Sequence, residues 1–220
     1  MSLPNEIKKE IQNITQKLME KGITNDENFP CLIQKSGRES IVTWNLQSSV
    51  SISLKNIKFE DIYRKIIDEK NYNFLLFDGS VIQILYTFKS NELISHRLVY
   101  FPSPQYVIDQ AELDNNENED DDFYKDLRTE HASRFQIRFD YSLTGCKEMV
   151  HPKSHIHMGG CKDCRIPLSS PITPSLFIDF VLRNFYSKLF YSHSDLNFKF
   201  SNKFPRTITK NEAKIVHLNF

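Results

Sequence analysis

The sequence predicts an α+β fold: a curved, mainly antiparallel sheet packed on a long buried C-terminal helix, with further helices at the N-terminus. Three observations predict it. Apolar residues recur at helical spacing near the start of the chain, apolar and polar residues alternate in several segments between residues 40 and 158, and an apolar run follows Pro174. With 220 residues, of which 40% are hydrophobic, the chain is long enough for a core of its own, and we expect one domain over residues 1–220.

Two amphipathic helices are expected in the first third of the chain. Pro4 suits the first turn of a helix that ends at Gly22. Its apolar positions fall on one stripe: Ile7, Ile11, Ile14 and Leu18. Such a stripe usually packs in the core, and the alternative is that this first helix docks a protein partner. A second helix is predicted from Phe59 to Lys70.

Alternating segments predict five to seven strands. Two short strands are expected between Ser40 and Leu54. A meander then follows, with a turn at Asp78-Gly79. Its strands are expected at Phe74–Phe77, Val81–Phe88 and Leu93–Phe101.

Two further strands, Arg134–Tyr141 and Val150–Met158, are expected to pair with each other. The acidic segment around residues 109–126 predicts a solvated loop, since five of the eight residues from Asn115 to Asp122 are carboxylates that repel one another. Thr173-Pro174 is a typical start for a helix over Ser175–Tyr191, and a last strand is expected at Lys214–Phe220.

Charge and cysteine content restrict the function classes. Lys plus Arg and Asp plus Glu both number 28, which argues against a globally basic nucleic-acid-binding protein but leaves room for a local basic patch. The sequence shows no secretory signal and no membrane span, so we expect a cytoplasmic protein that does not contact a membrane. Its four cysteines are then expected to be free thiols or metal ligands.

Residue types that commonly act in catalysis or bind metals are most concentrated between His151 and Pro167. Three of the seven histidines and two of the four cysteines lie there. On paired strands whose apolar faces both look inward, the polar faces look the same way. We therefore expect four side chains on one surface: Arg138, Asp140, His155 and His157.

These residue types suit acid–base cleavage of a phosphodiester in RNA or DNA. His155 would be the first base or acid, and His151 or His157 its partner. Asp140 would orient a histidine, and Arg138 would hold the phosphate. The alternative is that this surface is only the solvated face of the sheet.

A zinc site is a second prediction for the same stretch. Two imidazoles and two thiolates would complete a tetrahedral shell around the ion: His155, His157, Cys161 and Cys164. Only three residues separate His157 from Cys161, which is short for one loop that wraps an ion. The alternative is that the protein binds no cofactor.

The segment from residue 134 to 190 resembles a bacterial family of uncharacterised proteins. Its signature reads RxDY, HPxSHxxxG and CRIP, followed by a P-x-x-F-x-x-F-V-L-R-N-F-Y helix. The resemblance adds Ser154 and Arg165 to the candidate catalytic residues and favours His151 and His155 over His157. A looser similarity to small toxins of toxin–antitoxin pairs implies a nuclease in an antiviral defence or toxin-type system. The alternative is a non-catalytic or zinc-stabilised module that binds a partner within a complex.

Overall fold

The computed structural model describes residues 2–44, 58–104, 135–159, 163–193, 196 and 204–220. Its α-helices are α1 (Leu3–Glu20), α2 (Phe59–Asp68), α5 (Pro174–Phe185) and α6 (Ser187–Ser192). The strands of the first half are β1 (Thr24–Glu27), β2 (Cys31–Gln34), β3 (Glu39–Thr43), β4 (Phe74–Leu76) and β5 (Val81–Lys89). Those that follow are β6 (Glu92–Phe101), β7 (Ile137–Ser142), β8 (Ser154–Met158) and β9 (Ile166–Pro167).

All the strands of the described residues join one nine-stranded sheet, in which every pairing is antiparallel. Its order is β1-β4-β5-β6-β7-β8-β9, and the β2–β3 hairpin joins through β3 to the second half of β5. The prediction of an α+β fold with a mainly antiparallel sheet is therefore confirmed. The expected five to seven strands were too few, because β1, β2 and β9 were missed.

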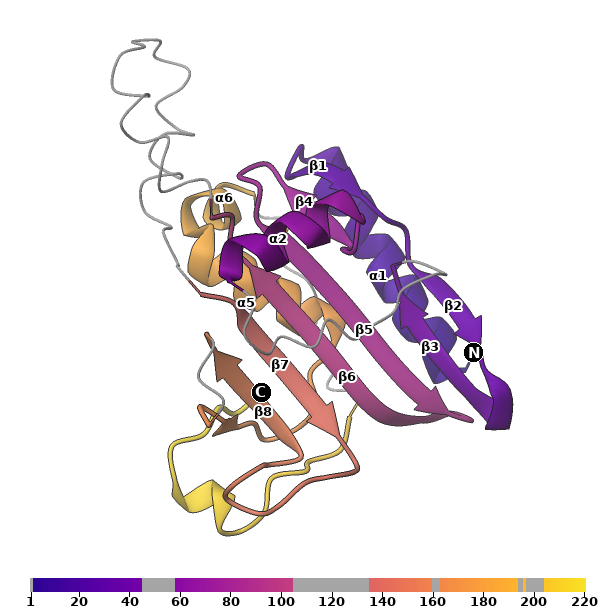
Figure 1. Ribbon diagram of the computed structural model, residues 1–220, viewed down its shortest axis with the longest axis vertical. Coiled ribbons are helices and arrows are strands. Elements are labelled where there is room, and N and C mark those ends of the chain that lie inside the picture. The colour runs from indigo at the N-terminus through magenta and orange to yellow at the C-terminus, as the bar shows by residue number, and fades with distance from the viewer. Residues whose placement is uncertain (1, 45–57, 105–134, 160–162, 194–195, 197–203) are drawn as a thin grey trace.

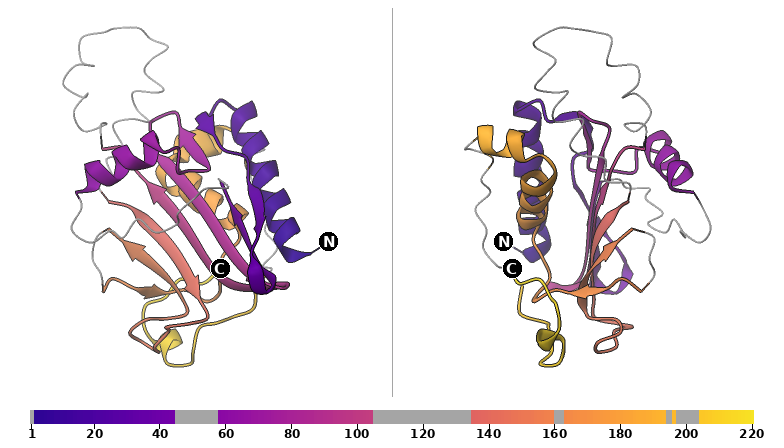
Figure 2. Two further views of the ribbon diagram at one scale, coloured as in Figure 1. Left: turned by 45° about the vertical axis from the view of Figure 1, so that its right-hand side comes forward. Right: turned by 90° about the vertical axis from the view of Figure 1, so that its left-hand side faces the viewer.

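Helices cover the two faces of the sheet unequally (Figures 1 and 2). Seen edge-on, the sheet has α1, α5 and α6 on one side and α2 on the other. We call these the α1/α5 face and the α2 face. Among the described residues, α2 is the helix on the α2 face, and it packs near one end of β5 and β6 on Val81, Val99 and Phe101.

The main core lies on the α1/α5 face. The predicted stripe of α1 is fully buried there, so the sequence-based helix is confirmed, and Gly22 follows it with a φ of +62° that suits glycine. Because the apolar stripe packs in the core, a protein partner of α1 would have to bind the opposite side of the helix. That this helix has a partner stays a prediction.

The predicted long C-terminal helix is wrong. It is broken at Tyr186 (φ −136°, ψ 44°) into the short helices α5 and α6. Tyr186 is buried, and its hydroxyl donates to Oδ2 of Asp78 at 2.7 Å, so a tertiary hydrogen bond fixes this residue outside helical geometry. The helix is also not buried all round, because Asn184 and Tyr191 are exposed. Its predicted start is confirmed: Oγ1 of Thr173 accepts from the backbone N–H of Leu176 at 3.3 Å.

The C-terminal strand predicted at Lys214–Phe220 does not form. A 3-10 turn spans Glu212–Lys214, and the tail then touches the chain beyond β9 through one parallel bridge, Leu168 with Leu218. Pro167 and Pro171 flank that bridge and have no N–H to donate, which explains why no longer ladder develops.

Several other predictions can be placed. The helix at Phe59–Lys70 and the three meander strands are confirmed as α2, β4, β5 and β6. Of the two strands expected in Ser40–Leu54, the first is β3, whereas the rest of that segment and the acidic loop lie largely or wholly outside the described residues. Among the described residues, the structure has no helix that is long and apolar enough to cross a membrane.

Candidate functional site

Strands β7 and β8 bring together the four side chains that the sequence predicted to share one surface. In the β7–β8 register, Arg138 lies opposite His157 and Asp140 lies opposite His155. Phe139 and Ile156, which alternate with them, belong to the main core. The four polar side chains therefore share the α2 face, beyond the part that α2 covers.

Arg97 is a fifth member that the sequence did not reveal. It lies on β6 directly opposite Asp140, and its side chain is 48% exposed. The position of this charged residue beside the apolar run Leu98–Phe101 could have marked it as a candidate. Only the register between β6 and β7, however, shows that it lies beside Asp140. We call the five residues the Arg–Asp–His cluster: Arg97, Arg138, Asp140, His155 and His157.

Two guanidinium groups hold the carboxylate of the cluster. Nε of Arg138 donates to Oδ2 of Asp140 at 2.7 Å, and Nε of Arg97 donates to Oδ1 at 3.3 Å. Burial raises the pKa of Asp140, but Arg138 and Arg97 more than offset it, so the pKa lies below its usual value. Asp140 is therefore ionised at neutral pH.

The two imidazoles of the cluster face each other. Their Nε2 atoms are 3.0 Å apart, and Nε2 of His157 is 3.7 Å from Oδ2 of Asp140. Nδ1–H of His155 donates to the carbonyl of Pro152 at 2.7 Å, because a carbonyl can only accept. The lone pair of His155 is thereby placed on Nε2, the atom that points into the cluster.

Burial keeps both histidines neutral. Burial lowers the pKa of His157 to about 4, and the positive charge of Arg138 contributes. Burial also lowers the pKa of His155, although the carbonyl of Pro152 and Asp140 partly oppose it. At neutral pH the cluster therefore contains two uncharged imidazoles.

His151 reaches the site from a turn and not from the predicted strand. The strand begins at Ser154 instead of Val150, because Met149 has a φ of +66° and a bridge joins Lys147 with His151. The Nδ1–H of His151 donates to the carbonyl of Gly145 at 2.8 Å. Its ring lies edge-on to that of His155, with 4.9 Å between the centroids.

Arg165 borders the cluster from the segment before β9. Ile166 pairs with Ile156, so Arg165 lies one step beyond, beside His157. Its positive charge contributes to the lowered pKa of both His155 and His157. Its Nε is buried and has no hydrogen-bond partner among the described residues.

Ser154 is not at the site. It lies opposite Tyr141, a residue of the main core, so its side chain is on the α1/α5 face, away from His155. Its candidate catalytic role is therefore not supported by the geometry.

The predicted zinc ligands are not all brought together. Cys161 lies outside the described residues. In the part of the chain that is described, one group of three or more metal-binding side chains brings its ligand atoms within 4.8 Å of one another: Asp140, His155 and His157. Cys164, a free thiol, is not in that group.

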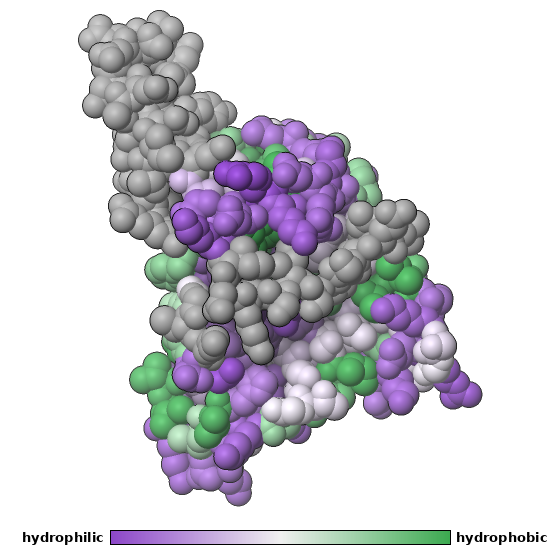
Figure 3. Space-filling model, in the orientation of Figure 1, coloured by the Kyte–Doolittle hydropathy of each residue, from purple (hydrophilic) through white to green (hydrophobic). Residues whose placement is uncertain are grey.

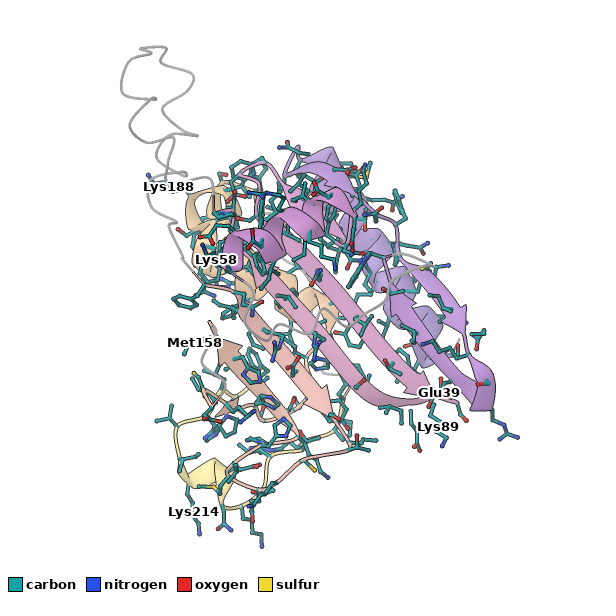
Figure 4. The ribbon with its side chains drawn as sticks, in the orientation of Figure 1. Glu39, Lys58, Lys89, Met158, Lys188 and Lys214 are labelled. Carbon is teal, nitrogen blue, oxygen red and sulfur yellow. The ribbon has the colours of Figure 1, made fainter. Side chains whose placement is uncertain are left out.

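The surroundings of the cluster are hydrophilic and net positive. Figure 3 shows hydrophilic residues on this face over α2 and, interspersed with hydrophobic ones, around β7 and β8, and Figure 4 shows nitrogen-bearing side chains gathered over those strands below Met158. The guanidinium groups of Arg97 and Arg138 hold Asp140, and Arg165, whose Nη1 donates to Oδ1 of Asp163 at 3.4 Å, adds a third guanidinium group beside His157. The cluster therefore attracts anions and offers neutral nitrogen and carboxylate oxygen atoms beside them.

Fold and site together define an α+β protein with an arginine-rich carboxylate–imidazole cluster on the α2 face of an antiparallel sheet. The chain belongs to the family described as uncharacterized conserved protein (DUF2290), whose model matches residues 23–220. This confirms the expected membership in a family of unknown function. No curated protein and no solved structure matches the chain.

Proposed function

We propose that this protein is a nuclease that hydrolyses phosphodiester bonds of RNA or DNA at the Arg–Asp–His cluster. The observation that carries the proposal is the combination of three guanidinium groups with two neutral imidazoles and an ionised carboxylate on one face of the sheet, where Arg97 is half exposed. Guanidinium groups bind phosphate oxygens through paired N–H donors, and unprotonated imidazoles accept protons or bind cations.

The arginines are assigned to substrate binding and charge stabilisation. Arg97 is the most exposed member and is placed to meet an incoming phosphate, while Arg138 is more buried and fixed by Asp140. The unpartnered Nε of Arg165 gives a third donor on the side of His157. Together they would stabilise the negative charge that develops on the phosphoryl oxygens.

The acid–base pair expected from the sequence needs revision. Such a pair needs one neutral and one protonated imidazole, yet the pKa of His157 lies at about 4 and that of His155 is also lowered. Neither is a proton donor at neutral pH. We assign activation of the attacking water to Asp140, His155 and His157 as a unit, and His151, which borders His155, to protonation of the leaving oxygen.

The reaction adds water across a phosphorus–oxygen bond. The water oxygen bonds to phosphorus and the bond to the leaving oxygen breaks. One proton of the water passes to the cluster, and the leaving oxygen takes one from His151. Proton exchange with solvent then restores both groups.

Cleavage of end-labelled RNA and DNA by the purified chain tests the proposal. Wild type is expected to cleave at least one of them, and His155→Ala to lose at least a hundredfold in rate because it removes the central imidazole. His193→Ala is the matched control, since His193 follows α6 on the opposite side of the sheet. No cleavage of either nucleic acid by folded wild type, or equal rates in wild type and His155→Ala, contradicts the proposal.

A module that binds a partner without catalysis is the second candidate. Exposed apolar side chains on two neighbouring segments favour it: Leu143, Met149, Val150, Ile215 and Val216. The backbone N–H of Met149 donates to Glu212, which holds these segments together. Folded but inactive wild type would favour this function.

The setting in a defence or toxin-type system stays a prediction. It depends on the looser similarity to small toxins, which neither the fold nor the site tests. Growth arrest on expression of wild type, absent with His155→Ala, would support it.

A further inference from the structure

We propose that Asp140, His155 and His157 bind one divalent transition-metal ion, such as Zn²⁺, with coordination positions left open for water and a phosphate oxygen. This inference deepens the proposed function, and its claim about catalysis rests on it, although metal binding is testable by itself. The three residues are called the ligand triad below.

The spacing of the ligand triad suits one ion. One donor atom from each residue lies within 4.8 Å of the other two, and the two Nε2 atoms are 3.0 Å apart. Two nitrogens bound to Zn²⁺ at tetrahedral geometry would be about 3.3 Å apart, given Zn–N distances near 2.0–2.1 Å. A small outward shift of the imidazoles is therefore enough to accommodate the ion.

A hydrogen bond from His155 to a residue outside the ligand triad orients this histidine as a metal ligand. Metal-binding histidines typically donate their other N–H to a carbonyl or carboxylate, which directs the lone pair at the metal. Pro152 accepts this hydrogen bond from Nδ1 of His155. Two Nε2 atoms at 3.0 Å need a proton or a cation between them, because two lone pairs at that distance repel.

The arginines are compatible with a bound cation. Each carboxylate oxygen has two lone pairs, so Asp140 keeps one free on Oδ2 while Arg138 uses the other. Ligating carboxylates are commonly hydrogen-bonded in this way. The positive charges of Arg97, Arg138 and Arg165 do oppose a second cation, and an anionic phosphate would offset this repulsion. Metal and phosphate should therefore strengthen the binding of each other.

Among the described residues, the donor set is of the catalytic kind. Structural zinc sites have four protein ligands, whereas catalytic sites have three and keep a position for water. Among the described residues the triad contains three ligands and excludes Cys164. An ion at this place would lower the pKa of a bound water toward about 7, which supplies the attacking oxygen.

Titration of the chelator-treated full chain with Co²⁺, followed by visible absorption, and with Zn²⁺ by calorimetry tests the site. Wild type is expected to bind one ion per chain, more tightly in the presence of inorganic phosphate. Asp140→Asn and His157→Ala are expected to weaken binding at least tenfold. Cys164→Ser is expected to bind as wild type does, and circular dichroism of each variant checks that it is folded.

Each outcome decides the proposal. Absence of stoichiometric binding by folded wild type, with phosphate present, would overturn it. So would loss of binding in Cys164→Ser, which would indicate the thiolate site. If metal-free wild type cleaves nucleic acid at full rate, the catalytic role of the metal is contradicted, while the proposed nuclease function is supported. If wild type binds the metal but cleaves no nucleic acid, the proposed metal site is supported and the proposed nuclease function is contradicted.

Discussion

At the scale of single residues, the opposite faces of the sheet give histidine two different roles. His155 and His157 lie on the α2 face within the Arg–Asp–His cluster. His96, one residue before Arg97 on β6, faces the main core between the rings of Tyr86 and Tyr141. Its Nε2 accepts from the backbone N–H of Ile172 at 3.3 Å, so it is a structural residue.

His96 should make the fold sensitive to acid. Burial lowers its pKa from 6.5 to about 4, so the unfolded chain takes up a proton that the folded chain does not. The contribution is fully present above about pH 6.5 and is lost as pH falls toward about 4, by up to about 3 kcal/mol. Urea unfolding between pH 4 and 7 is expected to show a smaller pH slope in His96→Gln than in wild type.

The glutamine keeps an oxygen that accepts the N–H of Ile172 but does not titrate. Acidic groups and the cluster histidines affect both proteins alike, so the difference between the slopes isolates His96. Identical slopes in the two proteins would contradict this account of the buried imidazole.

At the scale of elements, the cap of α5 is a local feature that sequence and structure agree on. Thr173 is buried, and its hydroxyl oxygen satisfies the free N–H of Leu176. Thr173→Ala is expected to lower the free energy of unfolding by about 1 kcal/mol, measured by urea unfolding. Thr173→Ser keeps the oxygen and should recover most of the loss. A serine variant as unstable as the alanine variant would show that the hydroxyl oxygen is not the stabilising group.

Elements with a strong local pattern could be predicted, whereas those set by tertiary contacts could not. The four-residue stripe of α1 and the alternation in β7 needed no knowledge of the rest of the chain. The strands β1, β2 and β9 have only four, four and two residues, and Thr24–Glu27 is polar throughout, so no periodicity marks them. The break at Tyr186 depends on Asp78, which is 108 residues away in the sequence.

The same distinction between local pattern and tertiary contact applies to the residues of the candidate site. Arg138, Asp140, His155 and His157 were predicted because adjacent strands must turn their apolar faces to one core. Arg97 was missed because its position depends on the register between β6 and β7, whose connection is long. Ser154 was included because a motif records spacing along the chain and not the face on which a side chain lies, and the structure places it on the α1/α5 face.

At the scale of the whole molecule, the sheet both supports the core and presents the site. The helices of the α1/α5 face bury the apolar side of β6, β7 and β8, and α2 packs near one end of β5 and β6 on the other side (Figure 2). This arrangement lets rigid, hydrogen-bonded strands position the Arg–Asp–His cluster, in which His155 and His157 are buried and Arg97 is half exposed. An overall charge of zero is compatible with this anion site, because the arginines are gathered locally.

Steady-state cleavage kinetics of Arg97→Met beside wild type test the central claim most directly, since Arg97 joins the site only through the fold. Methionine keeps much of the length of the side chain but removes its N–H donors and charge. Because Arg97 is half exposed and assigned to phosphate binding, KM is expected to rise about tenfold, with a smaller change in kcat and little change in melting temperature. Unchanged KM and kcat in Arg97→Met would contradict the assignment of this surface as the substrate site.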